Sequence, residues 1–129
     1  MPKRISVKGL QKKLEHLNRD YLKKIRGDKC ELCKENKAVV ADHCFSRKVR
    51  QLFFDRRNLT VLCGGCHFKK THRINGVDLQ IYELVKSREG ESSFLEMFKV
   101  SKYHKPFPEF SKRWYLEEVE KELKNLNQL

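Results

Sequence analysis

Two Cys-x-x-Cys pairs carry the clearest chemical signal in this 129-residue chain, Cys30 with Cys33 and Cys63 with Cys66. Two residues between the ligands of a pair let one turn present both thiolates to the same ion, and four thiolates suit tetrahedral Zn²⁺. We therefore predict a structural zinc site, with a redox dithiol as the alternative. Residues 34–62 separate the pairs by more than the roughly 15–20 residues of compact zinc ribbons, which indicates an inserted hairpin.

A second group of polar side chains lies within and just after that insertion. Asp42 and His67 offer a carboxylate oxygen and an imidazole nitrogen, a donor pair that suits Mg²⁺ or Mn²⁺ shared with a phosphate oxygen. His43, with an unperturbed pKa of ~6.5, is largely neutral at pH 7 and can accept a proton from water. Either histidine alone fits a structural role better, but their occurrence with Asp42 and Asn58 favours a catalytic site.

The charge of the chain indicates a polyanionic partner. Lys and Arg number 29 against 17 Asp and Glu, which gives a formal net charge of +12. A basic surface gains free energy by releasing counterions from phosphates, although charge alone fits a merely soluble basic protein equally well. The candidate phosphate contacts are Arg47, Lys48, Arg50, Arg56, Arg57, Lys69 and Lys70.

Short elements must bring these residues together. Strands over 38–43 and 58–62, antiparallel to each other, would deliver Asp42 and His43 to one end of a hairpin, and a helix beginning near Gly65 would carry His67. An amphipathic basic helix over 6–26 precedes them, capped by Ser6. We predict one domain, residues 1–129, made of a basic N-terminal helix (1–29), a metal-bound core (30–74) and a helical C-terminal extension (75–129).

The extension divides into three predicted parts. Helices over 78–87 and 93–100 are separated at Gly90, and Phe94, Leu95 and Phe98 are candidate core residues of the second. A stiff linker over 103–110 contains two prolines. The last helix, within 111–129, carries an apolar stripe that packs within the chain or pairs two protomers, formed by Leu116, Val119, Leu123 and Leu126.

The chain has no stretch of the ~20 apolar residues that a membrane span needs, and its first residues lack the apolar core of a secretory signal. We expect an intracellular, cytoplasmic protein without a membrane partner. In a reducing compartment the cysteines are more plausible as metal ligands than as disulfides, and Cys44 is left as a small buried apolar residue.

These residues in this order resemble the HNH endonuclease family, whose fold is called ββα-metal. His43 matches the first His of the motif, Asn58 its Asn and His67 its last His, at separations of 15 and 9 residues, and the Cys pairs match the zinc-stapled branch. The resemblance implies an α+β fold with flanking N- and C-terminal helices. It also implies a catalytic ion on Asp42 and His67, His43 as general base, and Asn58 as the residue that constrains the His43 loop.

A further resemblance is to the NinG (Rap) recombination nucleases of lambdoid phages, which cut branched DNA such as Holliday junctions. It extends to the basic N-terminal helix and to the Lys-Arg-Trp sequence at 112–114, and the chain differs in carrying His67 where those proteins have Asn. The resemblance implies a bacterial or phage nuclease acting on four-way junctions, with 5′-phosphate and 3′-hydroxyl products.

The sequence thus predicts a metal-dependent DNA endonuclease. Two alternatives stay open: a nuclease of the same kind acting on duplex DNA, and a catalytically silent zinc module that only binds nucleic acid. If His43 is the base with an ordinary pKa, activity should fall below about pH 6.

Overall fold

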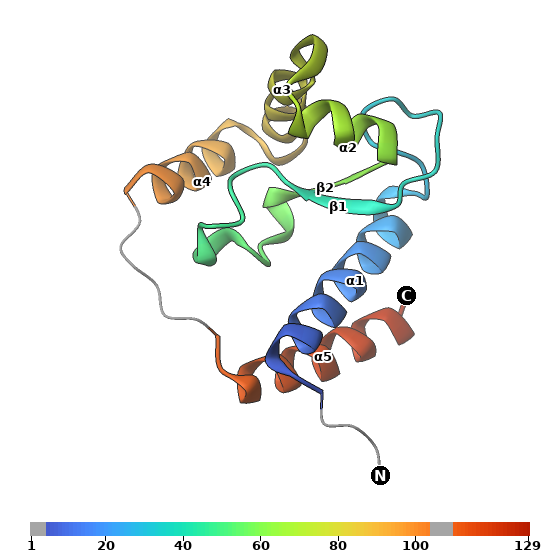
Figure 1. The fold of residues 1–129 in the computed structure, drawn as a ribbon, viewed down its shortest axis with the longest axis vertical. Helices are drawn as coiled ribbons and strands as arrows, with labels where there is room; N and C mark the ends of the chain where they lie inside the picture. Colours follow the sequence, from blue (N-terminus) through green and yellow to red (C-terminus); the bar gives the residue numbers. More distant parts are fainter. Residues whose placement is uncertain (1–4, 104–109) are drawn as a thin grey trace.

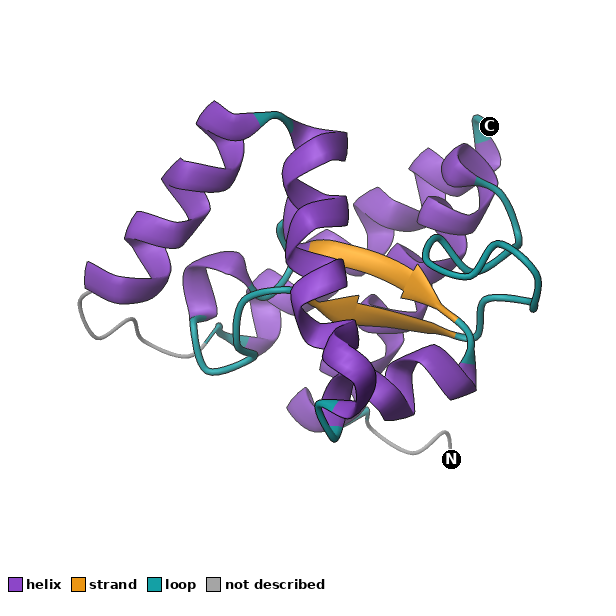
Figure 2. Ribbon diagram, turned by 90° about the horizontal axis from the view of Figure 1, so that it is seen from above, coloured by secondary structure: helices purple, strands orange, loops and turns teal. Residues whose placement is uncertain are grey.

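In a computed structural model of the chain, which describes residues 5–103 and 110–129, helices surround a small two-stranded sheet (Figures 1 and 2). The α-helices of these residues are α1 (Val7–Arg26), α2 (Gly64–Thr71), α3 (Val77–Glu89), α4 (Glu91–Tyr103) and α5 (Lys112–Asn127). The strands are β1 (Val40–His43) and β2 (Leu59–Leu62), and single 3-10 turns occur at Arg50–Leu52, Arg56–Asn58 and Ile74–Gly76. The fold of the described residues is therefore mixed α and β.

Helix α1 forms where the apolar spacing predicts it. Ser6 caps its N-terminus by accepting a hydrogen bond from the Gly9 amide at 3.0 Å, and Gly27, at a φ of 104° that favours glycine, ends it. Its buried face includes Leu10 and Leu14, which pack against α5, and Leu22, which packs against the sheet. The helix therefore joins the C-terminal segment to the hairpin.

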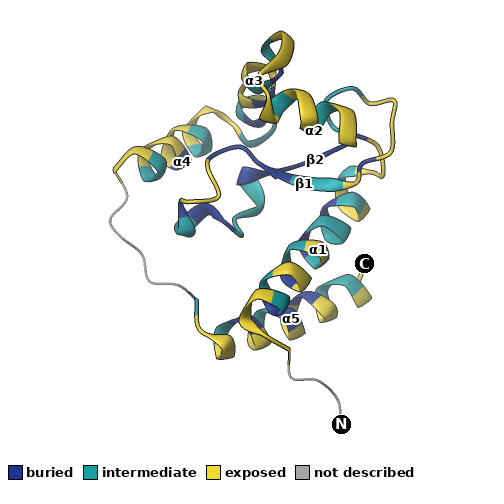
Figure 3. Ribbon diagram, in the orientation of Figure 1, coloured by how far each residue is buried: buried dark blue, intermediate teal, exposed yellow. Residues whose placement is uncertain are grey.

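The hairpin is antiparallel, as predicted, and pairs Val40 with Leu62 and His43 with Leu59. Strand β1 begins two residues later than expected, because the Ala38 amide donates to the Asp28 carbonyl at 2.8 Å and so belongs to the turn that carries the first Cys pair. Strand β2 likewise begins one residue after Asn58. In Figure 1, α2 lies on one side of the two strands and α1 on the other, and Figure 3 shows that the strands are largely buried between them.

Helices α3 and α4 form with a break at Gly90, as predicted, but the core face of α4 differs from the prediction. Met97 is fully buried, whereas Leu95 and Phe98 are 48% and 39% exposed, and only Phe94 of the expected trio packs on the core. Residues two apart on a helix point about 200° away from each other, so a helix that buries Met97 must expose Leu95. The predicted linker over 103–110 lies outside the described residues except at its two ends.

Helix α5 packs within the chain, against α1, which is one of the two arrangements that its stripe allows (Figure 1). The buried face is offset from the predicted one: Tyr115 and Val119 point inward, while Leu116 and Leu123 are exposed. Two partners explain the offset. Tyr115 joins an aromatic cluster with Phe54, Phe110 and Trp114, and the buried carboxylate of Glu122 forms an ion pair with Arg56.

A partly buried ion-pair network, which the sequence did not predict, joins α1 and α3 to the hairpin. Glu31, in the first Cys turn, binds Arg26 at the end of α1 at 3.2 Å and Arg88 near the end of α3 at 3.0 Å. Glu31 also accepts a hydrogen bond from the Val61 amide of β2 at 2.7 Å. The guanidiniums of Arg26 and Arg88 each also donate a hydrogen bond to the Leu59 carbonyl. The Glu31 carboxylate thus links the first Cys turn, α1 and α3 to strand β2.

Replacing Glu31 by Gln is therefore expected to destabilise the zinc-loaded protein by about 2 kcal/mol, because it removes one of the two carboxylates, Glu31 and Glu89, that pair with both largely buried guanidiniums. Urea unfolding at pH 7 measures the change. Glu117→Gln is the matched control, since the ion-pair partner of Glu117 among the described residues is exposed Arg113 on α5, and its loss should cost less than about 0.5 kcal/mol. Equal losses for the two variants would show that the network contributes no more than a surface pair.

Candidate metal centre and active site

The four cysteines of the two pairs converge on one point. Cys30 and Cys33 come from the turn before β1, and Cys63 and Cys66 come from the start of α2. All four Sγ atoms lie within 4.8 Å of one another, and Cys33 Sγ is 3.9 Å from Cys63 Sγ. Thiolates at ~2.3 Å from a tetrahedral Zn²⁺ are about 3.8 Å apart, so this cluster could hold a structural zinc ion.

The backbone around Cys33 favours its ionised, metal-binding form, whereas burial and the neighbouring thiols raise the pKa of Cys66. The amides of Asn36 and Glu35 lower the pKa of Cys33 to about 6. Cys63 caps the N-terminus of α2, where its sulfur accepts from the Cys66 amide at 3.4 Å. Amide donors stabilise a thiolate more than a thiol, which is how a site attracts a cation. Cys44, outside the cluster, behaves differently: burial raises its pKa to about 12.

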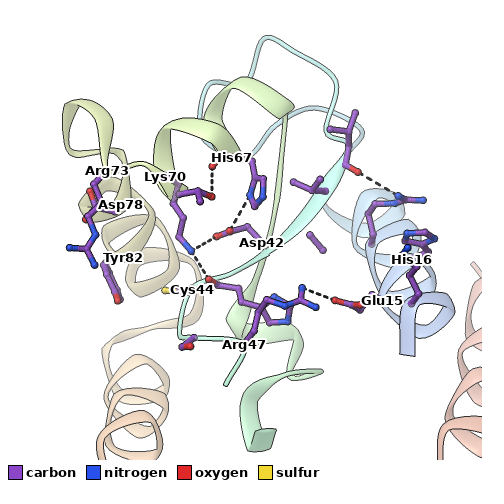
Figure 4. Close-up of a pocket in the computed structure, with 18 residues that line it drawn as sticks. Glu15, His16, Asp42, Cys44, Arg47, His67, Lys70, Arg73, Asp78 and Tyr82 are labelled. Atoms are coloured by element: carbon purple, nitrogen blue, oxygen red, sulfur yellow. Dashed lines mark hydrogen bonds and ion pairs between the residues drawn. The ribbon is translucent and has the colours of Figure 1, made fainter. Parts of the chain in front are cut away.

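Asp42 and His67 meet as the sequence predicts. Asp42, at the buried end of β1, is 4% exposed, and its Oδ1 lies 3.3 Å from Nδ1 of His67 on α2 (Figure 4). Lys70, one turn further along α2, brings its Nζ to 3.2 Å from the other oxygen, Oδ2, and donates to the His43 carbonyl at 2.8 Å. An imidazole and an ammonium therefore flank one buried carboxylate.

The Asp42–His67 pair fits a divalent cation. Among the described residues, Oδ2 of Asp42 and Nδ1 of His67 are buried without a hydrogen bond, and Oδ2 forms an ion pair with the Lys70 ammonium at 3.2 Å. Buried acceptors without hydrogen bonds are costly, and a cation that replaced Lys70 at Oδ2 could bind both atoms. Burial raises the pKa of Asp42, an effect that Lys70 and His67 oppose. Carboxylate and imidazole are ligands that Mn²⁺ accepts, and Mg²⁺ accepts the former readily.

His43 lies beside this pair with one ring nitrogen fixed. Its Nε2 is 2.8 Å from the Phe53 carbonyl, and because a carbonyl can only accept, Nε2 carries the hydrogen and Nδ1 keeps its lone pair. The side chain is 6% exposed and lines the same pocket as Asp42 and His67. Burial lowers the pKa of His43 to about 4, assisted by the positive charges of Arg47 and Lys70. The ring is thus neutral at pH 7 with a free lone pair on Nδ1, and the same burial makes it a weaker base than an exposed imidazole.

This burial changes the expected pH dependence. Since the pKa of His43 is lowered to about 4, the ring stays neutral at pH 5 and the acid limb of a His43-dependent reaction moves below the value near pH 6 expected from the sequence. We predict that the ring carbon signals of His43 in an NMR titration of the zinc-loaded protein do not move between pH 8 and pH 5. The exposed ring of His72 gives a second histidine signal in the same spectra for comparison. A His43 midpoint near 6.5 would show that burial does not control this ring.

Asn58 anchors the loop that leads to Phe53, the residue whose carbonyl accepts the hydrogen bond from His43. Its side chain is fully buried, where Oδ1 accepts from the Phe45 amide at 2.7 Å and Nδ2 donates to the carbonyls of Phe45 and Leu52. Every polar atom of the amide is used, and the loop is closed across 45–52. Phe53, whose carbonyl holds His43, follows directly, so Asn58 positions His43 through the backbone.

The predicted phosphate contacts divide into two sets. Arg47 is 58% exposed and lines the pocket while pairing with Glu15, Arg50 stacks over Phe53, and Lys70 lies at the site itself. Lys48 and Lys69 are exposed at the surface. By contrast, Arg56 pairs with buried Glu122 and stacks over Tyr21, and Arg57 pairs with Asp55 and Glu96. The side chains of Arg56 and Arg57 are therefore engaged in contacts that stabilise the fold.

The pocket around His43 has a volume of about 780 Å³ and contains basic residues that the sequence prediction missed. Lys12 and Arg19 reach it from α1, and Arg73 reaches it from beyond α2. In Figure 4 the helix of His16 borders one side and Tyr82 and Arg73 the other. Positions 12, 15, 16 and 19 share one helix face, so helical spacing would have grouped them. Only tertiary packing shows that this face borders the site.

Comparisons with protein-family models, with curated proteins and with solved structures found no match. No helix in the described part of the chain is long and apolar enough to cross a membrane.

Proposed function

We propose that this protein is a metal-dependent DNA endonuclease with an HNH-type core, formed by β1, β2 and α2. The observation that carries the proposal is the state of His43: a neutral ring, fixed through Nε2, beside a buried carboxylate–imidazole pair in one basic pocket. A purely structural histidine needs no such pair, and a zinc module that only binds DNA needs neither. The HNH resemblance of the sequence assigns the same residues to the same roles.

In phosphodiester hydrolysis, each residue of the site has a separate role. His43 Nδ1 accepts the proton of the attacking water, and Asn58 with the Phe53 carbonyl keeps the ring in the tautomer that this step requires. Asp42 and His67 would hold Mg²⁺ or Mn²⁺, which when bound supplies positive charge to the phosphate in the transition state. Lys70 and Arg47 line the pocket and can pair with the phosphate oxygens.

Branched DNA is the substrate that we propose. The net charge of +12 favours a polyanion, and basic residues reach the pocket from α1, from the hairpin loop and from α2, so the site is bordered by charge from three elements. The resemblance to NinG recombination nucleases names four-way junctions in particular. Cleavage of plain duplex DNA is the alternative, and the exposed stripe residues Leu116 and Leu123 leave pairing of two protomers through α5 open.

The proposal is tested with the Asp42→Asn variant, which removes the carboxylate charge with little change in shape. We expect Mn²⁺ to raise the melting temperature of the zinc-loaded parent but not that of the variant, because only the parent offers an anionic ligand. We also expect the parent to nick supercoiled plasmid or a four-way junction in Mg²⁺ or Mn²⁺, and the variant to fail. A folded parent that cuts neither substrate would leave the silent DNA-binding module as the better description.

A further inference from the structure

A second cavity, of about 440 Å³, adjoins the active-site pocket and is lined mainly by aromatic rings. Phe45 from the hairpin loop, Tyr82 from α3, and Phe94 and Phe98 from α4 form its walls. Lys102 lies at its edge, with Nζ 5.7 Å from the centre of the Phe98 ring. The volume is within the roughly 300–1,000 Å³ of small-ligand pockets. We call this cavity the aromatic groove.

The rings of the groove are held by one another. The Phe45 ring centre lies 5.7 Å from that of Tyr82, 5.4 Å from that of Phe94 and 6.4 Å from that of Phe98. Phe45 itself is buried, and Asn58 fixes its backbone on both sides. Phe98 and Tyr82 nevertheless remain 39% and 37% exposed. The aromatic rings of the groove are therefore packed against one another but remain accessible to solvent, whereas core side chains are not.

The groove adjoins the active-site pocket and shares lining residues with it. Tyr82 and Ser46 line both cavities, and Figure 4 shows Tyr82 at the border of the pocket that contains Asp42 and Lys70. A strand whose phosphate lies at Asp42 would therefore have this wall within its reach. Lys102 also lines the groove, so a strand that runs from Lys70 in the active-site pocket into the groove would meet a second positive charge there.

We propose that the aromatic groove stacks an unpaired nucleobase next to the phosphate that is cut. Bases have apolar faces that stack on aromatic side chains at roughly 1–3 kcal/mol each, without regard to sequence. A base within duplex DNA is already stacked and paired and would enter only at the cost of unstacking and unpairing, which is a few kcal/mol. The groove would thus select DNA with an unpaired nucleotide at the cleavage point, as at a bulge, a flap or an open junction. This inference rests on the proposed nuclease function and adds the feature of the substrate that the enzyme recognises.

The test uses a hairpin DNA that carries one unpaired 2-aminopurine, and a matched hairpin in which that base is paired. Stacking quenches 2-aminopurine fluorescence, so binding of the zinc-loaded parent without added Mg²⁺ or Mn²⁺ should quench the unpaired probe and not the paired one. Phe98→Ala should abolish the quench and weaken binding of the unpaired hairpin about tenfold, with binding of the paired hairpin unchanged. Leu95→Ala is the matched control, because Leu95 is an exposed residue of the same helix outside the groove.

The possible outcomes separate this inference from the nuclease proposal, since the probe reports binding without cleavage. Equal quenching by Phe98→Ala and the parent, or no quenching at all, would overturn the groove assignment even if the parent cuts DNA. Quenching that depends on Phe98 would support it even if no substrate is cut. If Phe98→Ala instead abolishes self-association in sedimentation and leaves the quench unchanged, the groove binds a second copy of the chain and the base-stacking assignment is wrong.

Discussion

A chelator strong enough to remove zinc is expected to unfold the hairpin and the helices that pack on it. Strands β1 and β2 have only four residues each, and an isolated two-stranded hairpin is marginal in water. A structural Zn²⁺ contributes about 10–16 kcal/mol, comparable to the entire stability of a small domain. Cys63 also caps α2, so loss of the ion would release the helix that carries His67.

Cys63→Ser should reproduce the effect of the chelator, with loss of the cooperative melting transition and of one bound zinc per chain. Circular dichroism and a colorimetric zinc assay measure the two quantities. Cys44→Ala is the matched control, because Cys44 is a buried thiol outside the cluster, and it should retain its zinc and melt cooperatively. Stability that responds to oxidants but not to chelators would identify the four cysteines as a redox dithiol system.

His43→Ala is expected to lower the single-turnover rate of DNA cleavage by a factor of about 10²–10⁴, the usual contribution of a general base. The substitution should lower the rate of the chemical step and leave the DNA affinity unchanged. His43 is buried at the base of the pocket, and its Nε2 is already hydrogen-bonded to the Phe53 carbonyl. The substitution leaves a space in which added imidazole can act, so partial rescue by imidazole is also expected.

His72→Ala is the control for that experiment. His72 lies at the exposed end of α2, where its ring contacts Phe68, and it does not line the pocket. Its removal should change the rate less than twofold. Both variants should retain zinc, and His43→Ala should lower the melting temperature more than His72→Ala because it removes a buried, hydrogen-bonded ring. A His43→Ala variant that is folded and cuts at the parental rate would exclude this residue as the base.

The local signals in the sequence were sufficient to predict most of the elements. The spacing of Leu10, Leu14 and Leu22 predicted α1, and the Cys pairs together with the apolar runs predicted the antiparallel hairpin between them. The motif residues Asp42, His43, Asn58 and His67 were predicted to converge, and the structure brings them around one pocket and its supporting loop. Such features depend on spacing along the chain, which a sequence displays directly.

Features that depend on packing between distant segments could not be predicted in this way. Glu31, Arg26 and Arg88 each look like ordinary surface charges, and only the closed fold makes them one partly buried network. The lowered pKa of His43 likewise follows from burial under the Phe53 loop. On α5, Leu116 and Val119 are equally apolar, so the buried side is decided by partners far away in sequence.

The nuclease proposal is tested most directly by the ends left on a cut four-way junction. Zinc-loaded parent protein is incubated in Mn²⁺ with a junction labelled on each strand, and the ends of the products are assayed with polynucleotide kinase and terminal transferase. We predict cleavage at an unpaired or branch-point nucleotide that leaves a 5′-phosphate, which kinase labels only after phosphatase treatment, and a 3′-hydroxyl, which terminal transferase extends. A 5′-hydroxyl or a blocked 3′ end, or an intact junction in the presence of folded, DNA-bound protein, would contradict the nuclease proposal.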